Sequence, residues 1–256
     1  MAATNRCLRM GLAIGLCACA AQAARGALSV GINFVGKENF SFSSMDITET
    51  AGAEPQAFWN NAKSGSGSLS SLLDSAGRLT AVSAAWRGDG WYLPVSNDPG
   101  NRRLMRGYIR DLGTEPATVT LTGLDTVFGG TYTVLVYFDG TNGGTAWAAD
   151  YRVGAVTLRG TDLANTDFTG AFVRDGGAGG NYLRFENLQG PGFTLSAAPL
   201  AGSTAVINAL QIVHTPEPAT VGLLGTGLAV SLLIHHRARR HVQKAGCGLM
   251  EIARLT

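Results

Sequence analysis

Carboxylate side chains are the groups in this sequence whose types and number could support catalysis. Five of them could supply the pair that a glycoside hydrolase needs: Asp139, Asp150, Asp162, Asp167 and Glu186. Such a pair lies about 5 to 9 Å apart across the bond that is cleaved. No motif singles out two of the five, and an Asp followed by Gly, as at Asp139-Gly140, is typical of a turn. The sequence therefore predicts no catalytic residue, and a carboxylate-based glycan hydrolase or lyase is kept as the third alternative.

The other common catalytic groups are missing from the middle of the chain. Residues 25–214 contain no cysteine, and their only histidine is His214. A Ser-His-Asp triad, a Cys-His pair or a histidine-based zinc site needs more than this set provides. His214 directly precedes Thr215 and a proline-containing segment, so we expect it to be a solvated linker residue. We therefore expect a protein that is not an enzyme and that has no cofactor.

Oxygen-containing side chains around one glycine-rich loop could bind calcium. Asp139, Asn142 and Asp150 flank the Asn142-Gly143-Gly144 turn, and Ca²⁺ takes six to eight oxygen ligands. Their spacing matches neither the EF-hand loop nor the glycine-rich repeat loops that bind calcium. A plain hairpin loop without a metal is the expected structure, with these three residues as the alternative calcium candidate.

Aromatic residues beside turns could bind sugars by stacking. Trp91, Tyr92 and Trp147 are in such positions. The alternative is that these rings fill the core, which is the more common place for tryptophan. The basic cluster at residues 101–106 lies between Asp98 and Asp111, and we expect it to be a solvated edge.

The body of the chain is predicted to be all-β. Short runs rich in β-branched and aromatic residues alternate with Gly, Asn and Asp turns, and Gly reaches 35 of 256 residues. The predicted strands are residues 28–35, 118–121, 131–138, 182–185 and 205–213. Residues 55–62 could form one helical turn, and the Ser/Gly-rich residues 64–71 are expected to be a flexible loop. Together these elements predict a single antiparallel β-sandwich, jelly-roll-like, over residues 24–214.

Residues 1–23 have the pattern of a secretory signal peptide with a signal helix. Arg6 and Arg9 precede an apolar run, and Ala21-Gln22-Ala23 fits the small-x-small cleavage site. Lipoprotein processing at Cys19 is the alternative. The pattern predicts Sec-type export across the inner membrane.

Charge is divided between the body and the two ends. Residues 25–214 carry 13 basic and 16 acidic side chains, a net charge of −3, whereas the whole chain has a net charge of +2. The excess of positive charge therefore belongs to the end segments and not to a binding surface of the body. We expect no nucleic-acid partner.

An apolar run near the C-terminus predicts a single transmembrane helix. Residues 219–234 contain no charged side chain, and a 16-residue helix spans roughly 24 Å, a little less than the hydrocarbon core of about 30 Å. Arg237, Arg239 and Arg240 follow, which places this side in the cytoplasm by the positive-inside rule. A buried core helix is the alternative. Residues 241–256 would then be a short cytoplasmic extension, to which the sequence assigns no role.

The tripeptide Pro216-Glu217-Pro218, the Gly/Leu/Ala-rich span and the arginine cluster occur in this order within residues 215–240. This arrangement resembles the PEP-CTERM sorting signal of proteins exported by Gram-negative bacteria. The resemblance implies that an exosortase cleaves near the tripeptide and releases the body from its membrane anchor. It also implies a cell-surface or extracellular location in a bacterium that makes exopolysaccharide. The extension after Arg240 departs from the pattern, which usually stops at the arginine cluster.

The final strands suggest two functions for the body. The order of a glycine-rich turn, NYLRF, GFTLSA and INALQIV is similar to the closing strands of jelly-roll domains in exported bacterial proteins, many of which bind carbohydrate. We expect an exported, non-enzymatic cell-surface or extracellular-matrix protein associated with exopolysaccharide or biofilm. A carbohydrate-binding module is the alternative.

Overall fold

The computed structural model of the chain describes residues 28–37 and 42–215, and these residues form an all-β structure with two helices of four residues each. No helix within these residues is long and apolar enough to cross a membrane. The predicted signal peptide, the predicted transmembrane helix and the residues after it lie outside the described part of the chain.

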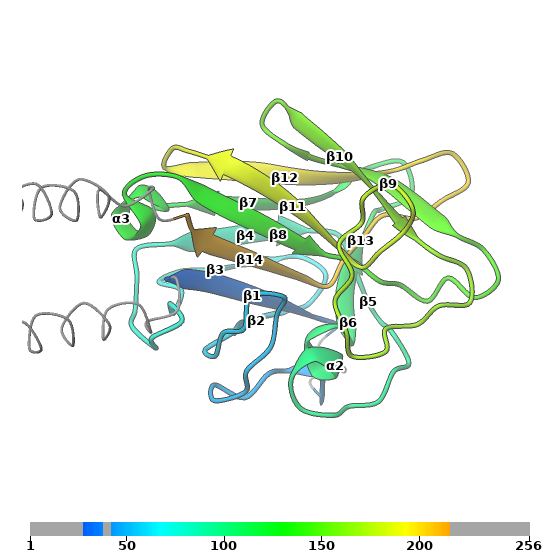
Figure 1. Cartoon of the computed structure of the whole chain (residues 1–256), viewed down its shortest axis with the longest axis horizontal. Coiled ribbons are helices and arrows are strands. Elements are labelled where there is room, and N and C mark those ends of the chain that lie inside the picture. Colours follow the sequence, from blue (N-terminus) through cyan, green and yellow to red (C-terminus); the bar gives the residue numbers. More distant parts are fainter. Residues whose placement is uncertain (1–27, 38–41, 216–256) are drawn as a thin grey trace, which may run out of the picture. The chain divides into compact units, whose positions relative to one another are not determined.

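A five-stranded sheet contains the most deeply buried strands, and its strands are labelled in Figure 1. Its strands are, in spatial order, β11 (Tyr182–Leu188), β8 (Tyr132–Tyr137), β14 (Ala209–His214), β1 (Ser29–Gly36) and β2 (Asn60–Lys63). Every residue of β1 and β8 is buried. Because both faces of these strands are covered, their sequences are nearly continuous apolar runs. This explains why β1, β8 and β14 could be recognised from the sequence.

A six-stranded sheet supplies the second large layer of strands. Its strands are β10 (Val156–Asp162), β9 (Trp147–Val153), β12 (Gly192–Pro199), β7 (Ala117–Thr122), β4 (Ser83–Arg87) and β3 (Gly67–Leu69). In β7 the side chains of Ala117, Val119 and Leu121 are buried, whereas the threonines between them are not. Thr120 shares a hydrogen bond of 2.9 Å with Thr194 on the exposed face of this sheet. One face of this sheet is therefore solvated, as alternating strands require.

A small third sheet and the two helices complete the described structure. The sheet consists of β13 (Val206–Ile207), β6 (Gly107–Arg110) and β5 (Asp89–Tyr92) and lies at one end of the large sheets in Figure 1. The helices are α2 (Asn101–Leu104) and α3 (Asp125–Phe128). Buried apolar residues from all three sheets belong to one hydrophobic cluster, so the layers share a single core.

The predicted last strand is two strands in the structure. Asn208 separates β13 from β14, and its side chain accepts a hydrogen bond from the Asp139 backbone N–H at 2.7 Å and donates to the Met105 carbonyl at 2.7 Å. The chain leaves the small sheet and enters the five-stranded sheet at this residue. The apolar run gave no sign of the break because both strands are buried.

Four expectations from the sequence were wrong. The strands are not all antiparallel, because β2 pairs parallel to β1 after the chain returns through residues 42–59. Residues 55–62 form no helical turn and instead lead into β2, and residues 64–71 contain the short strand β3. His214 is not a free linker residue, since it ends β14 and stacks on Phe128 with ring centroids 6.5 Å apart. In each case a neighbouring strand or ring supplies the stabilising contact, and local sequence does not show it.

Candidate functional site

A cavity of about 200 Å³ brings together three of the five carboxylates named from the sequence: Asp139, Asp162 and Asp167. Asp139 follows the end of β8, and Asp162 is the last residue of β10. Asp167 lies in the loop between β10 and β11, which supplies most of the remaining wall. The cavity is smaller than the roughly 300 to 1,000 Å³ of a typical small-molecule pocket. Its size fits an ion with its water shell, or the end of a larger ligand.

Backbone and amide hydrogen bonds join the two chain segments next to this acidic cavity. The Gly140 N–H donates to Asp162 Oδ2 at 2.9 Å. The Asn142 side-chain amide donates to the carbonyls of Asp162 at 3.2 Å and Leu163 at 3.0 Å. The Asn165 N–H donates to the Gly143 carbonyl at 2.6 Å. The loop after β8 is thereby tied along its length to the loop after β10.

The carboxyl groups of the cavity are in an unfavourable electrostatic environment. Burial, together with the charges of Asp162 and Asp167, raises the pKa of Asp139 to about 9. Burial also raises the pKa of Asp162 to about 7, with a further increase from Asp167 and partial compensation by the hydrogen bonds from Gly140 and Asn142. Desolvation dominates both shifts because water stabilises the charged form of a carboxyl group far better than a protein interior does.

Two buried oxygen atoms have no hydrogen-bond partner, one on the wall residue Asp139 and one on Asn142, which bonds to the wall residues Asp162 and Leu163. They are Asp139 Oδ1 and Asn142 Oδ1. The amide of Asn142 donates both of its hydrogen bonds to backbone carbonyls, and this fixes the orientation of its Oδ1. Unpartnered buried oxygens are rare in folded proteins and call for an explanation.

The structure does not bring Asp150 or Glu186 to this cavity. Asp150 pairs across the β9–β10 hairpin with Arg159, whose Nε lies 3.0 Å from Asp150 Oδ1. Asp162 lies three residues beyond Arg159 on the same strand, so the two aspartates point to opposite faces of the hairpin. Glu186 accepts from Arg184 at 2.9 Å. Within the described ranges, no group of three or more His, Cys, Asp or Glu side chains is arranged to hold a metal ion.

Trp91 is partly buried, and two cationic side chains lie close to its ring. Its ring packs against the core, the Lys37 ammonium lies 4.6 Å from the ring centroid, and the Arg110 guanidinium lies 4.7 Å from it. Arg110 also makes an ion pair with Asp89 at 2.9 Å on the neighbouring strand. The tryptophan therefore serves as a cation–π partner within the small sheet.

Tyr92 and Trp147 both border the loop after β8. The Thr141 hydroxyl in this loop donates to the Tyr92 carbonyl at 2.9 Å. Gly140 lies so close to the Trp147 ring that a Cβ atom there would come within 2.5 Å of it. Both residues are partly buried, and the Tyr92 ring packs edge-on against Phe42 with the ring centroids 6.2 Å apart.

A wider groove of about 570 Å³ was not predicted from the sequence. It lies between β11 and the β9–β12 part of the six-stranded sheet, and its wall includes Arg152, Gln189, Phe193, Thr194 and Ser196. The Phe193 ring stacks on Tyr132 with centroids 6.2 Å apart. These residues come from separate strands, so no local motif could have revealed the groove.

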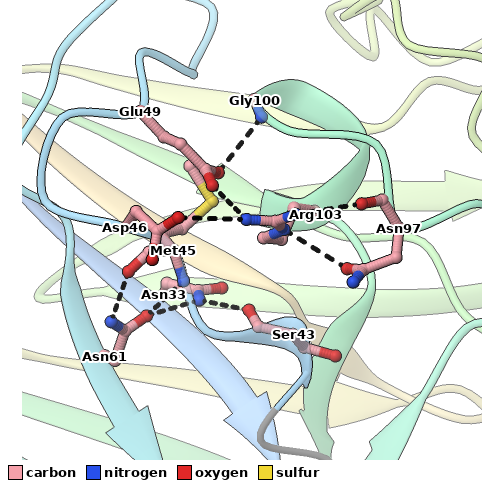
Figure 2. A network of polar contacts seen from close by, with 9 residues as sticks. All are labelled: Asn33, Ser43, Met45, Asp46, Glu49, Asn61, Asn97, Gly100 and Arg103. Atoms are coloured by element: carbon pink, nitrogen blue, oxygen red, sulfur yellow. Dashed lines mark hydrogen bonds and ion pairs between the residues drawn. The ribbon is translucent and has the colours of Figure 1, made fainter.

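The basic cluster at residues 101–106 is a second departure from expectation, because its central arginine is largely buried. Arg103 forms an ion pair with Glu49, and their side chains are only 14% and 9% exposed (Figure 2). Arg103 also donates to the Asn97 side chain at 3.3 Å and to the Asn97 carbonyl at 3.1 Å. Glu49 accepts in addition from the Gly100 N–H at the start of α2 at 3.2 Å. The expectation of a solvated edge holds for Arg102, whose guanidinium contacts are exposed, and fails for Arg103.

Figure 2 also shows why the segment after residue 41 stays on β1. The Asn33 amide donates to the Ser43 carbonyl and to Asn61 Oδ1, both at 2.8 Å. Asn61 and the Met45 backbone exchange two hydrogen bonds of 2.9 Å. These contacts are structural, since they join β1 and β2 to the connection between them.

No protein-family model matches this chain, and no curated protein resembles it significantly. The candidate sorting residues, which are Pro216, Glu217, Pro218, Arg237, Arg239 and Arg240, lie outside the described residues.

Proposed function

We propose that this chain is an exported, non-enzymatic protein of the cell surface or extracellular matrix. A C-terminal PEP-CTERM-type signal sorts it, and an exosortase cleaves it. Its body is a jelly-roll-like β-sandwich that associates with exopolysaccharide. The single observation that carries the proposal is the order of Pro216-Glu217-Pro218, an uncharged 16-residue run and an arginine cluster.

The position of the last strand is consistent with release by cleavage. β14 lies between β1 and β8 in the five-stranded sheet and ends at His214. The Thr215 N–H still donates to the Thr131 carbonyl at 3.1 Å, and the Thr215 hydroxyl shares a hydrogen bond of 3.0 Å with Thr133. The ordered contacts of the body therefore extend to the residue before the tripeptide. A cut at the tripeptide would leave every described strand in place.

Replacing Pro216, Glu217 and Pro218 by alanine tests the sorting function. In a host that has an exosortase, we expect the wild-type chain to be cleaved and released, and the triple variant to stay uncleaved in the membrane fraction. The mature mass and the membrane-bound fraction are measured by mass spectrometry and by fractionation followed by immunoblotting.

Glu115→Ala is the matched control, because it removes one exposed carboxylate from the body, as the triple variant does from the tripeptide, and leaves the tail intact. We expect this control to be processed like wild type. Normal cleavage of the tripeptide variant, or equal cleavage in a host without exosortase, would contradict the proposed sorting.

Carbohydrate binding is the second candidate function, and the groove between β11 and β12 favours it. The groove combines an aromatic ring at Phe193 with hydroxyl, amide and guanidinium groups from Thr194, Ser196, Gln189 and Arg152. Saccharides are bound by this combination of an aromatic face and polar side chains. Tyr92 and Trp147, both partly buried, offer a second aromatic surface beside the loop after β8.

Pull-down of the purified chain with exopolysaccharide from a producing bacterium tests this second candidate. We expect retention of wild type and at least a tenfold loss of affinity for Phe193→Ala, since stacking on an aromatic ring contributes about 0.5–1.5 kcal/mol and area burial adds to it. Trp147→Ala is measured in parallel to separate the two surfaces. No retention on any polysaccharide contradicts carbohydrate binding, and release of soluble oligosaccharides contradicts the non-enzymatic assignment.

A further inference from the structure

The loop after β8 contains a buried carboxyl group that differs from the other buried carboxyl groups of the described fold. Asp74, Asp111 and Asp175 are buried too, but each accepts at least two hydrogen bonds, mainly from backbone N–H groups. Asp139 is 3% exposed and accepts none within the described residues. Asp162 is 4% exposed and accepts one, from Gly140.

Cationic side chains do not compensate these two carboxyl groups. Among residues 28–37 and 42–215, the ion pairs of Lys and Arg go to other acids, and none of them reaches Asp139, Asp162 or Asp167. A buried charge without a partner is strongly unfavourable. In their ionised form these carboxyl groups would need a positive charge, and the neighbouring side chains do not supply one.

The side-chain amide of Asn142 has an oxygen that can accept a hydrogen bond or bind a cation, and it has no hydrogen left to donate. The residue is 8% exposed, both hydrogens of its amide are used on the Asp162 and Leu163 carbonyls, and its Oδ1 has no partner. A hydrogen bond from a water molecule or from a protonated carboxyl group would be enough to satisfy one such oxygen. Here Asp139, three residues away on the same loop, has a second unpartnered oxygen and lines a cavity with two further carboxyl groups.

We infer that Asp139, Asn142 and Asp162 form a calcium site, with Asp167 at the wall of the same cavity and water completing the coordination. All of the protein ligands are oxygens, two on the loop after β8 and one at the end of β10, which suits the flexible coordination of Ca²⁺ better than the strict octahedron of Mg²⁺. Asp150, named from the sequence, is replaced by Asp162, because only the latter points to this face of the hairpin. With two carboxylates and one amide oxygen as protein ligands, the expected Kd is about 10⁻⁴–10⁻³ M, the range of extracellular calcium modules.

Thermal unfolding of the full chain, purified in mild detergent and stripped with EDTA, tests this site. At 10 mM CaCl2 the Tm of wild type is expected to rise by about 3–10 °C, from mass action and the usual size dependence. Asp139→Asn is expected to abolish the rise. Asp150→Asn is the matched control, since it removes the same charge from the outer face, and it should keep the rise. No calcium-dependent rise in wild type, an equal rise with MgCl2, or a full rise in Asp139→Asn would overturn the assignment.

Two further measurements keep the test decisive if Asp139→Asn does not fold. Asn142→Asp adds a negatively charged ligand, so it should be less stable than wild type in EDTA and gain more from CaCl2. A purely structural Asn142 would give a loss that calcium does not change. Trp147 packs on Gly140 beside the site, so TbCl3 bound there should show tryptophan-sensitised emission that CaCl2 displaces. Absence of that emission, or emission that calcium does not displace, would count against the site.

Discussion

Replacing Arg103 with alanine is expected to lower the free energy of unfolding by about 3 kcal/mol or more. The change leaves the Glu49 carboxylate, 9% exposed, with the Gly100 N–H as its remaining hydrogen-bond donor. It also removes the two hydrogen bonds to Asn97 that hold the chain before α2. For a domain of this size the corresponding fall in Tm is about 6–12 °C. Chemical denaturation of the purified chain measures the effect.

The neighbouring arginine of the same helix provides the control. Arg102 has 38% of its side chain exposed, and its ion pair with Asp98 is 3.7 Å long, so Arg102→Ala should cost about 1 kcal/mol or less. The double variant Glu49→Leu/Arg103→Met removes both charges, and it should recover much of the loss because no unpaired ion is left buried. Equal losses for Arg102→Ala and Arg103→Ala would show that the buried ion pair does not hold this region together.

The stability of the chain in the presence of a chelator is expected to fall as the pH rises. The folded state holds a proton on Asp139 up to a pKa of about 9, whereas the unfolded chain releases it near the ordinary value of 3.8. Asp162 behaves in the same way up to about 7. Because the folded state binds more protons between these limits, unfolding becomes easier from about pH 4 to pH 9. Over three pH units, at about 1.4 kcal/mol per unit for each proton, Asp139 alone contributes on the order of 4 kcal/mol, so we expect the free energy of unfolding to be lower at pH 8 than at pH 5 by several kcal/mol.

Asp139→Asn should remove most of this pH dependence, since its amide does not titrate. It should also make the chain more stable than wild type at pH 8 in EDTA. Asp150→Asn, on the exposed side of the hairpin and paired with Arg159, should leave the slope unchanged. A wild-type stability that rises from pH 5 to pH 8 in EDTA would contradict the unfavourable environment of Asp139. This result does not depend on whether calcium binds when it is present.

The all-β class and several strands could be predicted from the sequence because their signal is local. The apolar runs that became β1, β8 and β14 are buried on both faces, and the alternation in β7 matches a half-solvated strand. By contrast, β2 and β3 lie in polar or Ser/Gly-rich sequence. The strand conformation of β2 depends on pairing with β1, and that of β3 depends on pairing with β4. Both partners lie outside the local sequence of the strand they pair with.

The candidate site shows the same division between local and distant information. The sequence alone identified Asp139 and Asn142 as oxygen donors on one loop, and it excluded histidine and cysteine chemistry from the body. It also supplied all of the argument for export and sorting, since that argument depends on the order of residues in the end segments. Only the tertiary structure shows that Asp162 and not Asp150 lines the cavity, because the register of β9 on β10 pairs Asp150 with Arg159 and turns Asp162 to the other face. Only it placed Arg103 on Glu49 across more than fifty residues. Register and long-range pairing decide which groups meet, and a linear pattern of residue types does not contain them.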